Sequence, residues 1–381
     1  MARFSRAEWN ALVPDAHPFM DWDFLEALEA TGCASGATGW TPQHLAVRDG
    51  DGALVGAAPL YVKDHSRGEF VFDWSWADAL ERAGGQYYPK LLCAAPFTPV
   101  TGPRLLARDD ARRIGIVRLL AGAIAKATET SGLSSAHVNF LRKDDWELLG
   151  ADGWLQRIDQ QYHWINRGYE SFDDFLGALA SRKRKMIRKE RAAANEDLQI
   201  VRLSGDDLTS AHWDAFFAFY MDTGGRKWGS PYLNRAFFEL LHERMKDKVV
   251  MVMAMDDGAP VAAALNIAGR DALYGRYWGR RVNRPFLHFE VCYYQAIEHA
   301  IEAGLGRVEA GAQGDHKLAR GYEPVTTRSA HWITHPGLHA ALESYLDQER
   351  RAVAEGVEQL ADYTPFRKGP RSDEGLGEEE F

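Results

Sequence analysis

An internal repeat constrains the fold of this chain more than any other feature. Residues 44–62 and 249–268 each contain two apolar runs joined by an Asp/Gly turn, so each predicts a β-hairpin. The tripeptide His-Trp-Ile occurs at 163–165 and again at 331–333, each time at the end of a predicted strand and before an amphipathic helix. The repeat predicts two α/β units in tandem.

The length of 381 residues agrees with two units, because one core usually serves about 150–200 residues. In each unit a third strand rich in aromatic residues is expected after the hairpin, at 70–76 and 274–278. A short polar segment places the boundary so that the first unit covers 1–167 and the second 168–368, with a basic helix over 172–195 at its start. The acidic residues 369–381 predict a disordered tail.

Composition excludes several classes of protein. No run of eighteen uncharged apolar residues and no apolar leader is present, so we expect a cytoplasmic protein, with peripheral contact to the inner membrane as an option. The three cysteines are widely spaced and the histidines follow no zinc spacing, so neither a disulfide framework nor a metal site is expected. A net charge of −9 argues against unspecific nucleic-acid binding.

Residues 274–333 carry more polar and aromatic side chains than a core segment needs. The pattern predicts a strand, a loop with three arginines, a helix over 286–303 ending before Gly304, and a strand over 307–312 that runs into a glycine turn. A unit of this kind suits an anionic ligand. The first unit has no counterpart of GRRVNR followed by HFE, so we place the chemistry in the second unit.

Several segments resemble the FemAB-like predicted N-acyltransferases of the GNAT superfamily. They are FMDWDFLEALEATGCA near the start, RKWGSPYL at 226–233, YGRYWG at 274–279, HFEVCYYQAIEHAIEAGL at 288–305 and EAGAQGDHKLARGY at 309–322. The resemblance implies tandem duplicated GNAT-like domains, with a mixed sheet and flanking helices. It also implies transfer of an acyl or aminoacyl group to an amine, in a peptidoglycan-related context.

The resemblance implies no permanently bound cofactor; acyl-CoA, acyl carrier protein or aminoacyl-tRNA would be the co-substrate. GNAT enzymes usually hold the coenzyme A pyrophosphate in a glycine-containing loop, and this chain has GRRVNRPFLHFE at that place. Guanidinium groups of Arg280, Arg281 and Arg284 are therefore expected to replace backbone donors. His316, Lys317 and Arg320 follow the glycine turn at 311–314 and are expected to add cationic groups to the same anion site.

Acyl transfer to an amine needs a base, since an alkylammonium must lose a proton before it attacks. Glu290 is the first candidate, because it shares a helical face with Tyr294 and two isoleucines and would be partly desolvated there. The alternative is a structural acid that pairs with Arg276 or Arg280. Glu309, on the following strand, could orient the amine or act as the base, or pair with Lys317 or Arg320.

Aromatic and basic residues are candidates for substrate contacts. Tyr277 and Trp278 could line an acyl channel, although aromatic residues on strands more often belong to the core. Lys227 and Trp228, after Arg226, suit a substrate lid, although a cation resting on an exposed tryptophan would give the same sequence.

Residues 182–191 include seven Lys or Arg and one Glu in a helical context. A solvated helix face is the ordinary interpretation, and contact with coenzyme A phosphates, tRNA or anionic lipid is the alternative. This segment keeps two other functions open. One is a lipid N-acyltransferase that acts on a long-chain amine at the membrane surface, and the other is a non-catalytic module that binds cell wall or tRNA.

Overall fold

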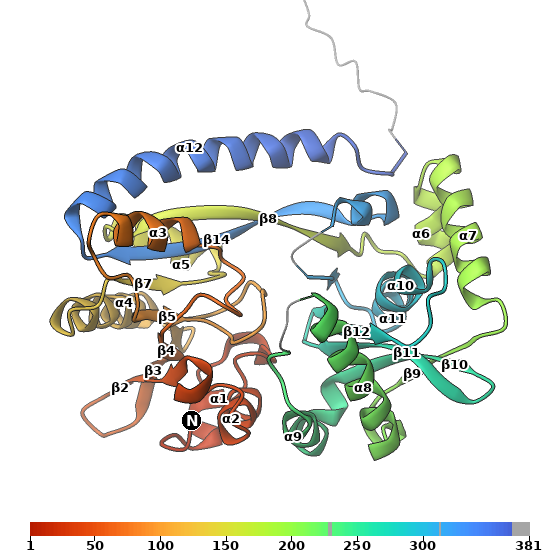
Figure 1. Cartoon of the computed structure of the whole chain (residues 1–381), viewed down its shortest axis with the longest axis horizontal. Coiled ribbons are helices and arrows are strands. Elements are labelled where there is room, and N and C mark those ends of the chain that lie inside the picture. The colour runs from red at the N-terminus through yellow and green to blue at the C-terminus, as the bar shows by residue number, and fades with distance from the viewer. Residues whose placement is uncertain (228–230, 312–313, 368–381) are drawn as a thin grey trace, which may run out of the picture.

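Eleven strands form one mixed sheet within the residues that the structure describes, in the order β1-β4-β5-β7-β14-β8-β13-β12-β11-β10-β9. This computed structural model describes residues 1–227, 231–311 and 314–367. A second sheet contains β2, β3 and β6. Helices flank the large sheet, and α12 extends along it across both halves (Figure 1). The architecture confirms the predicted fold class, tandem GNAT-like α/β units with a mixed sheet.

The elements of the first half alternate between helices and short strands. They are α1 (Arg6–Asn10), α2 (Trp22–Ala30), β1 (Trp40–Pro42), β2 (Leu45–Arg48), β3 (Leu54–Ala58), β4 (Leu60–Lys63), α3 (Trp74–Arg82), β5 (Lys90–Cys93), β6 (Leu106–Ala107), α4 (Arg113–Thr130), β7 (Ser135–Val138), α5 (Lys143–Ala151) and β8 (Leu155–Ile165).

The second half follows a similar plan with longer strands. Its elements are α6 (Phe172–Ala178), α7 (Ser181–Asn195), β9 (Gln199–Leu203), α8 (Ser210–Lys227), α9 (Arg235–Met245), β10 (Val249–Asp256), β11 (Ala259–Ala268), β12 (Ala272–Arg280), α10 (Leu287–Phe289), a π-helical turn η5 (Glu290–Tyr294), α11 (Gln295–Glu302), β13 (Arg307–Glu309), a 3-10 helix η6 (Asp315–Arg320), β14 (Glu323–Ile333) and α12 (Pro336–Ala361). Among the described residues, no helix is long and apolar enough to cross a bilayer.

The repeat appears in the structure with one difference. Both predicted hairpins form, β2 with β3 and β10 with β11. The strand predicted at 274–278 is part of β12, but the strand predicted at 70–76 is wrong, because residues 74–82 form α3. Trp76, Ala77 and Leu80 are the buried residues of that helix, and their spacing matches one helical face. The buried apolar residues there follow a helical period, not the alternation of a strand.

The two halves exchange their last strands. β14, from the end of the chain, pairs with β7, and β8, from the first half, pairs with β13. β8 and β14 also pair with each other, antiparallel, along most of their length. The two His-Trp-Ile tripeptides end these strands, and Trp164 and Trp332 take equivalent places opposite Val308 and Ala136. The boundary expected near residue 167 therefore divides the sequence but not the sheet.

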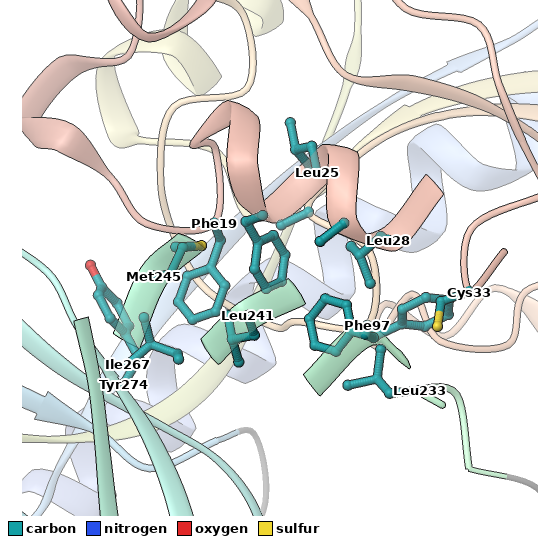
Figure 2. Close-up of a cluster of buried hydrophobic side chains, with 14 of the residues drawn as sticks. Phe19, Leu25, Leu28, Cys33, Phe97, Leu233, Leu241, Met245, Ile267 and Tyr274 are labelled. Atoms are coloured by element: carbon teal, nitrogen blue, oxygen red, sulfur yellow. The ribbon is translucent and has the colours of Figure 1, made fainter. Parts of the chain in front are cut away.

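A hydrophobic core joins the two halves on one side of the sheet. Residues of the first half such as Phe19, Leu25 and Leu28 pack there against Leu241 and Met245 of α9 (Figure 2). These side chains are nearly inaccessible to solvent. Burying an aliphatic or aromatic side chain of this size stabilises a fold by about 1.5–3 kcal/mol. The contact is therefore a shared core and not a loose domain interface.

The basic helix expected over 172–195 consists of two helices. α6 ends at Ala178, and Leu179 then forms an isolated bridge with Phe366. The backbone N–H of Ala180 donates to the carbonyl of Pro365 at 2.9 Å, so the chain after α12 holds the break in place. The cationic residues lie on α7 alone.

Candidate functional site

The parallel strands β12 and β13 separate after three residue pairs. Ala272, Leu273 and Tyr274 pair with residues 307–309, and β12 then continues to Arg280 while β13 ends. In the first half the equivalent parallel strands are β5 and β7, joined by α4. There the backbone N–H of Asn139 still donates to Cys93 at 3.1 Å, beyond the last strand pair. Both parallel pairs thus contain three residue pairs, and what distinguishes the second unit is that β12 continues to Arg280 beyond the last pair.

A β-bulge in β12 lies at this divergence. Leu265 of β11 pairs with Tyr277 and Asn266 pairs with Gly275, which leaves Arg276 without a cross-strand partner. Its Nη2 donates to the carbonyl of Glu309 at 3.3 Å. Its Nε has no partner in the described part of the chain, and burial lowers the pKa of the guanidinium. Bulges of this kind redirect side chains next to active sites.

A pocket of about 80 Å³ opens between β11, β12 and the helix that follows them. We call it the strand pocket. Its walls combine aliphatic, aromatic and polar side chains, namely Ala264, Leu265, Asn266, Gly275, Arg276, Tyr277, Trp278, His288, Cys292, Tyr293 and Ala310. Tyr277 and Trp278, predicted to contact substrate, both line it. The hydroxyl of Tyr277 also donates to the carbonyl of Phe97 at 3.0 Å, which fixes the ring from the other half.

Lys317 lies buried near the divergence, in η6. Its Nζ donates to the carbonyl of Gly311 at 2.8 Å, and the residue is 1% exposed. Burial, and then the charge of Arg276, lower the pKa of Lys317 to about 7. An ammonium group poised at this value can give up a proton near neutral pH. The sequence predicted Lys317 as a phosphate contact at a helix start, but η6 is a short 3-10 helix.

Glu290 is fully buried and its carboxylate is fully engaged. Arg191 of α7 donates to it twice, from Nη2 at 2.9 Å and from Nε at 3.0 Å, and Gln295 donates at 2.8 Å. The contact is with an arginine, as in the structural alternative, but neither Arg276 nor Arg280 is that arginine. These are the contacts of a structural acid, and the catalytic role of Glu290 stays a prediction.

Tyr294 and Arg320 also hold α7 in place, through hydrogen bonds to Glu190 of that helix. Glu190 accepts hydrogen bonds from the Tyr294 hydroxyl and from Arg320, whose Nη2 lies 2.8 Å from the carboxylate. The Arg320 guanidinium also lies 3.4 Å from the centroid of the Phe289 ring. Glu190 is 6% exposed. The neighbouring residues Glu190 and Arg191 thus fasten α7 to the helix that covers the strand pocket.

The remaining cationic candidates lie at the edges of this region. Arg280 donates to Asn283, and Arg281 is 6.0 Å from the Phe219 ring. Arg280, Arg281 and Arg284 form no ion pair with any described residue. The exposed His316 accepts or donates a hydrogen bond at 2.9 Å with the Tyr293 hydroxyl, beside the strand pocket. The Lys227 side chain and Trp228 fall outside the residues that the structure describes.

Glu309 lies at the end of β13, directly before Ala310 of the strand pocket. Its Oε1 accepts from Nε of Arg307 at 2.9 Å, and its Oε2 is 3.8 Å from Nε2 of His163. The register places His163 opposite Glu309. In the first half, His137 stands at the position equivalent to Glu309.

The sequence did not predict two of the residues that line the strand pocket, Arg276 and Cys292. The glycines on both sides of Arg276, at 275 and 279, were a usable sign of a bulge.

Comparison with known proteins agrees with this architecture. A model of the FemAB-like family, described as peptidoglycan biosynthesis/recognition, matches residues 1–368. The structure is similar to FemX, with 13% identity and a TM-score of 0.54, over 89% of this chain and 98% of that one. It is similar to L-PGS from Bacillus licheniformis, with 10% identity and a TM-score of 0.51, over 86% of this chain and 97% of that one. No curated protein matches the sequence.

Proposed function

Since the chain belongs to the FemAB-like family, we propose that it transfers an acyl or aminoacyl group from a thioester or tRNA carrier to an amine. The family description concerns peptidoglycan biosynthesis or recognition. Another structure of similar fold, at 8% identity and a TM-score of 0.50 over 84% of this chain and 96% of that one, is the C-terminal domain of a putative lysylphosphatidylglycerol synthetase from Agrobacterium fabrum. These names support the class of reaction.

One observation carries the proposal, the divergence of β12 from β13. Beyond Tyr274 and Glu309 no further residue pair joins β12 to β13 among the described residues, and β12 continues alone to Arg280. The edge of β12 beyond this point suits an extended ligand that adds in the manner of a strand. The strand pocket lies at the same place, with Arg276 at its wall and Lys317 nearby. A thioester or ester seated in it would meet cationic donors.

The proposed reaction uses three residues around this opening. The amine nitrogen forms a bond to the acyl carbon while the bond from that carbon to the sulfur or oxygen of the carrier breaks. Glu309 accepts the proton that the amine gives up, and the Lys317 ammonium donates one to the departing sulfur or oxygen. Arg276 stabilises the negative charge on the acyl oxygen. The proposed reaction does not use Glu290, whose carboxylate accepts hydrogen bonds from Arg191 and Gln295.

A transfer assay with blocked Cys292 tests the proposal. Purified protein is incubated with acetyl-CoA, palmitoyl-CoA or aminoacyl-tRNA and a mixture of amines, and the amide product is detected by mass spectrometry. Cys292 lines the strand pocket and is partly exposed, whereas Cys33 and Cys93 are buried. A maleimide on Cys292 would fill a pocket of about 80 Å³, so we expect it to lower the transfer rate at least about tenfold.

The Cys292→Ala variant is the matched control and should keep its transfer rate after the same treatment. Product formation that survives modification of Cys292 in the unaltered protein would place the donor elsewhere. Absence of product with every donor would contradict the proposed function itself and favour a binding module.

The exposed face of α7 supports a polyanionic carrier. Arg182, Lys185 and Lys189 are exposed, and none of them pairs with an acidic side chain among the described residues. On the same helix, Glu190 pairs with Arg320 and Arg191 pairs with Glu290. The face is therefore cationic and held next to the strand pocket. We propose that it contacts the phosphate backbone of tRNA.

A salt titration checks the role of this face. Changing Arg182, Lys185 and Lys189 together to Gln should weaken tRNA binding about tenfold or more at low salt and flatten the dependence of log Kd on log salt. The same change at Lys126, which is 73% exposed on α4, should do neither. If the triple variant instead loses only binding to anionic lipid vesicles, the face is a membrane contact and the lipid N-acyltransferase alternative gains support.

A further inference from the structure

A second, larger cavity lies where the two halves meet. It measures about 310 Å³ and is lined by His17, Thr101, Gly102, Arg142, His163, Arg307 and Glu309. We call it the junction cavity. Gly102 packs so tightly on His17 that a Cβ there would lie 2.5 Å from the ring Nε2. The volume is at the lower end of the range for small-molecule sites, about 300–1,000 Å³. It has room for a small metabolite.

The junction cavity and the strand pocket share the end of β13. Glu309 lines the junction cavity and the next residue, Ala310, lines the strand pocket. Neighbouring side chains of an extended segment point to opposite faces. The guanidinium of Arg276, in the wall of the strand pocket, contacts the backbone carbonyl of Glu309. The two cavities therefore lie on opposite faces of the segment that ends β13, and they meet where the pairing of β12 with β13 stops.

Two acceptor atoms in the wall of the junction cavity have no hydrogen-bond donor among the described residues. Glu309 is 1% exposed, and its Oε2 has no hydrogen-bond partner among the described residues. Burial lowers the pKa of His17 to about 3, so the ring is neutral. Its Nε2 lies 3.3 Å from the carbonyl of Thr101 and carries the proton, which leaves Nδ1 as an acceptor, also without a described partner. Two buried acceptors of this kind suit a ligand that brings a donor, such as an ammonium group.

The mouth of the junction cavity is cationic. The side chains of Arg142 and Arg307 are each 31% exposed, and they pair with Asp15 at 3.0 Å and with Asp271 at 2.8 Å. Behind them Arg104 is fully buried, and only the carbonyls of Val100 and Pro103 accept its hydrogen bonds in the described part of the chain. The two guanidinium groups that line the cavity, of Arg142 and Arg307, favour a carboxylate, which accepts two parallel hydrogen bonds from one arginine.

We propose that the junction cavity binds the acceptor of the reaction, an α-amino-acid-type ligand with its ammonium at Glu309 and its carboxylate at Arg142 and Arg307. Arg307 already lies 2.9 Å from Glu309, so donors and acceptors stand as close together as the two charged groups of an amino acid. This inference rests on the proposed function, because the nitrogen held at Glu309 is the one that attacks the acyl carbon.

Binding without any acyl donor tests the inference. A set of free L-amino acids is titrated into the full chain by calorimetry, together with the N-acetyl and carboxamide derivative of each. We expect at least one free amino acid to bind, and each derivative to bind at least about tenfold more weakly, as the loss of one charge-assisted hydrogen bond predicts. If no amino acid binds, or if the N-acetyl form binds equally well, the inference is overturned.

Two variants assign the two ends of the ligand. Arg142→Gln should abolish the preference for the free carboxylate over the carboxamide, and Glu309→Gln should abolish the preference for the free amine over the N-acetyl form. Arg142 lies at the mouth, so its variant keeps the test valid if Glu309→Gln does not fold. Arg270 is 76% exposed and also contacts Asp15, so it provides the control. Arg270→Gln should bind amino acids as the unaltered chain does, and an equal loss of binding there would refute the assignment.

The two proposals fail in different ways. Amino-acid binding without transfer would refute the proposed function alone, and transfer without such binding would refute this inference alone.

Discussion

Replacement of Glu290 by alanine is expected to lower the free energy of unfolding by about 3–5 kcal/mol, because it leaves a largely buried arginine without its main partner. The Glu290 side chain is 0% exposed and that of Arg191 is 19% exposed. Among the described acidic residues Arg191 then keeps Glu298, which is 28% exposed and screened by water. Urea denaturation followed by circular dichroism measures the change.

Two further variants separate the buried pair from its surroundings. Glu298→Gln should cost less than about 1 kcal/mol, as expected for a partly exposed ion pair. The double variant Glu290→Leu with Arg191→Met should recover much of the stability, since apolar side chains of similar volume often replace a buried ion pair without loss. A Glu290→Gln protein that unfolds normally but turns over about 100-fold more slowly would instead give this residue the role of general base.

Replacement of Lys317 by methionine should lower turnover by about 100-fold or more, because the proposed reaction loses its proton donor to the leaving group. The variant should also change how stability depends on pH. Burial and Arg276 lower the pKa of Lys317 to about 7 in the folded protein, from 10.5 in an exposed lysine. Between these two values the unfolded chain binds more protons at this site, so the stability of the unaltered protein rises with pH. Lys317→Met should lose that increment, which is at most about 5 kcal/mol.

Lys63 provides a matched control in the first half. It is equally buried, and burial lowers its pKa to about 7 as well. Its Nζ donates to the carbonyl of Gly39 at 3.1 Å, in a region that the proposed reaction does not use. Lys63→Met should alter the pH dependence of stability in the same direction and leave turnover unchanged. Equal losses of turnover in both variants would mean that a buried lysine supports the fold and not the chemistry.

Much of the fold could be predicted from the sequence because local patterns specify it. The two hairpins follow from Asp/Gly turns between apolar runs, and the repeated tripeptide marked the ends of β8 and β14. The exchange of these strands could not be predicted. Nothing in a strand's own residues states which strand it will pair with, since that choice depends on partners far away in the chain.

For the candidate site, too, the sequence predicted residues that depend on local patterns and missed those that depend on distant partners. Tyr277 and Trp278 were predicted near a ligand and do line the strand pocket, because both belong to β12, a strand that the sequence pattern predicted. For Glu290 the helical spacing correctly predicted the apolar face on which it lies. It gave no sign of the pairing with Arg191, which lies about a hundred residues earlier in the chain. The bulge at Arg276 depends on pairing between β11 and β12, and only the flanking glycines hinted at it.

The crossing of β8 and β14 between the halves has a physical consequence. The molecule is built like a domain-swapped dimer whose two protomers have been fused into one polypeptide. If the fusion were cut and the fragments parted, each would leave open edges in the middle of a sheet, and such edges recruit other chains. Each half thus depends on a strand from the other to complete its part of the sheet, so a change in one half cannot remove that strand without exposing the other.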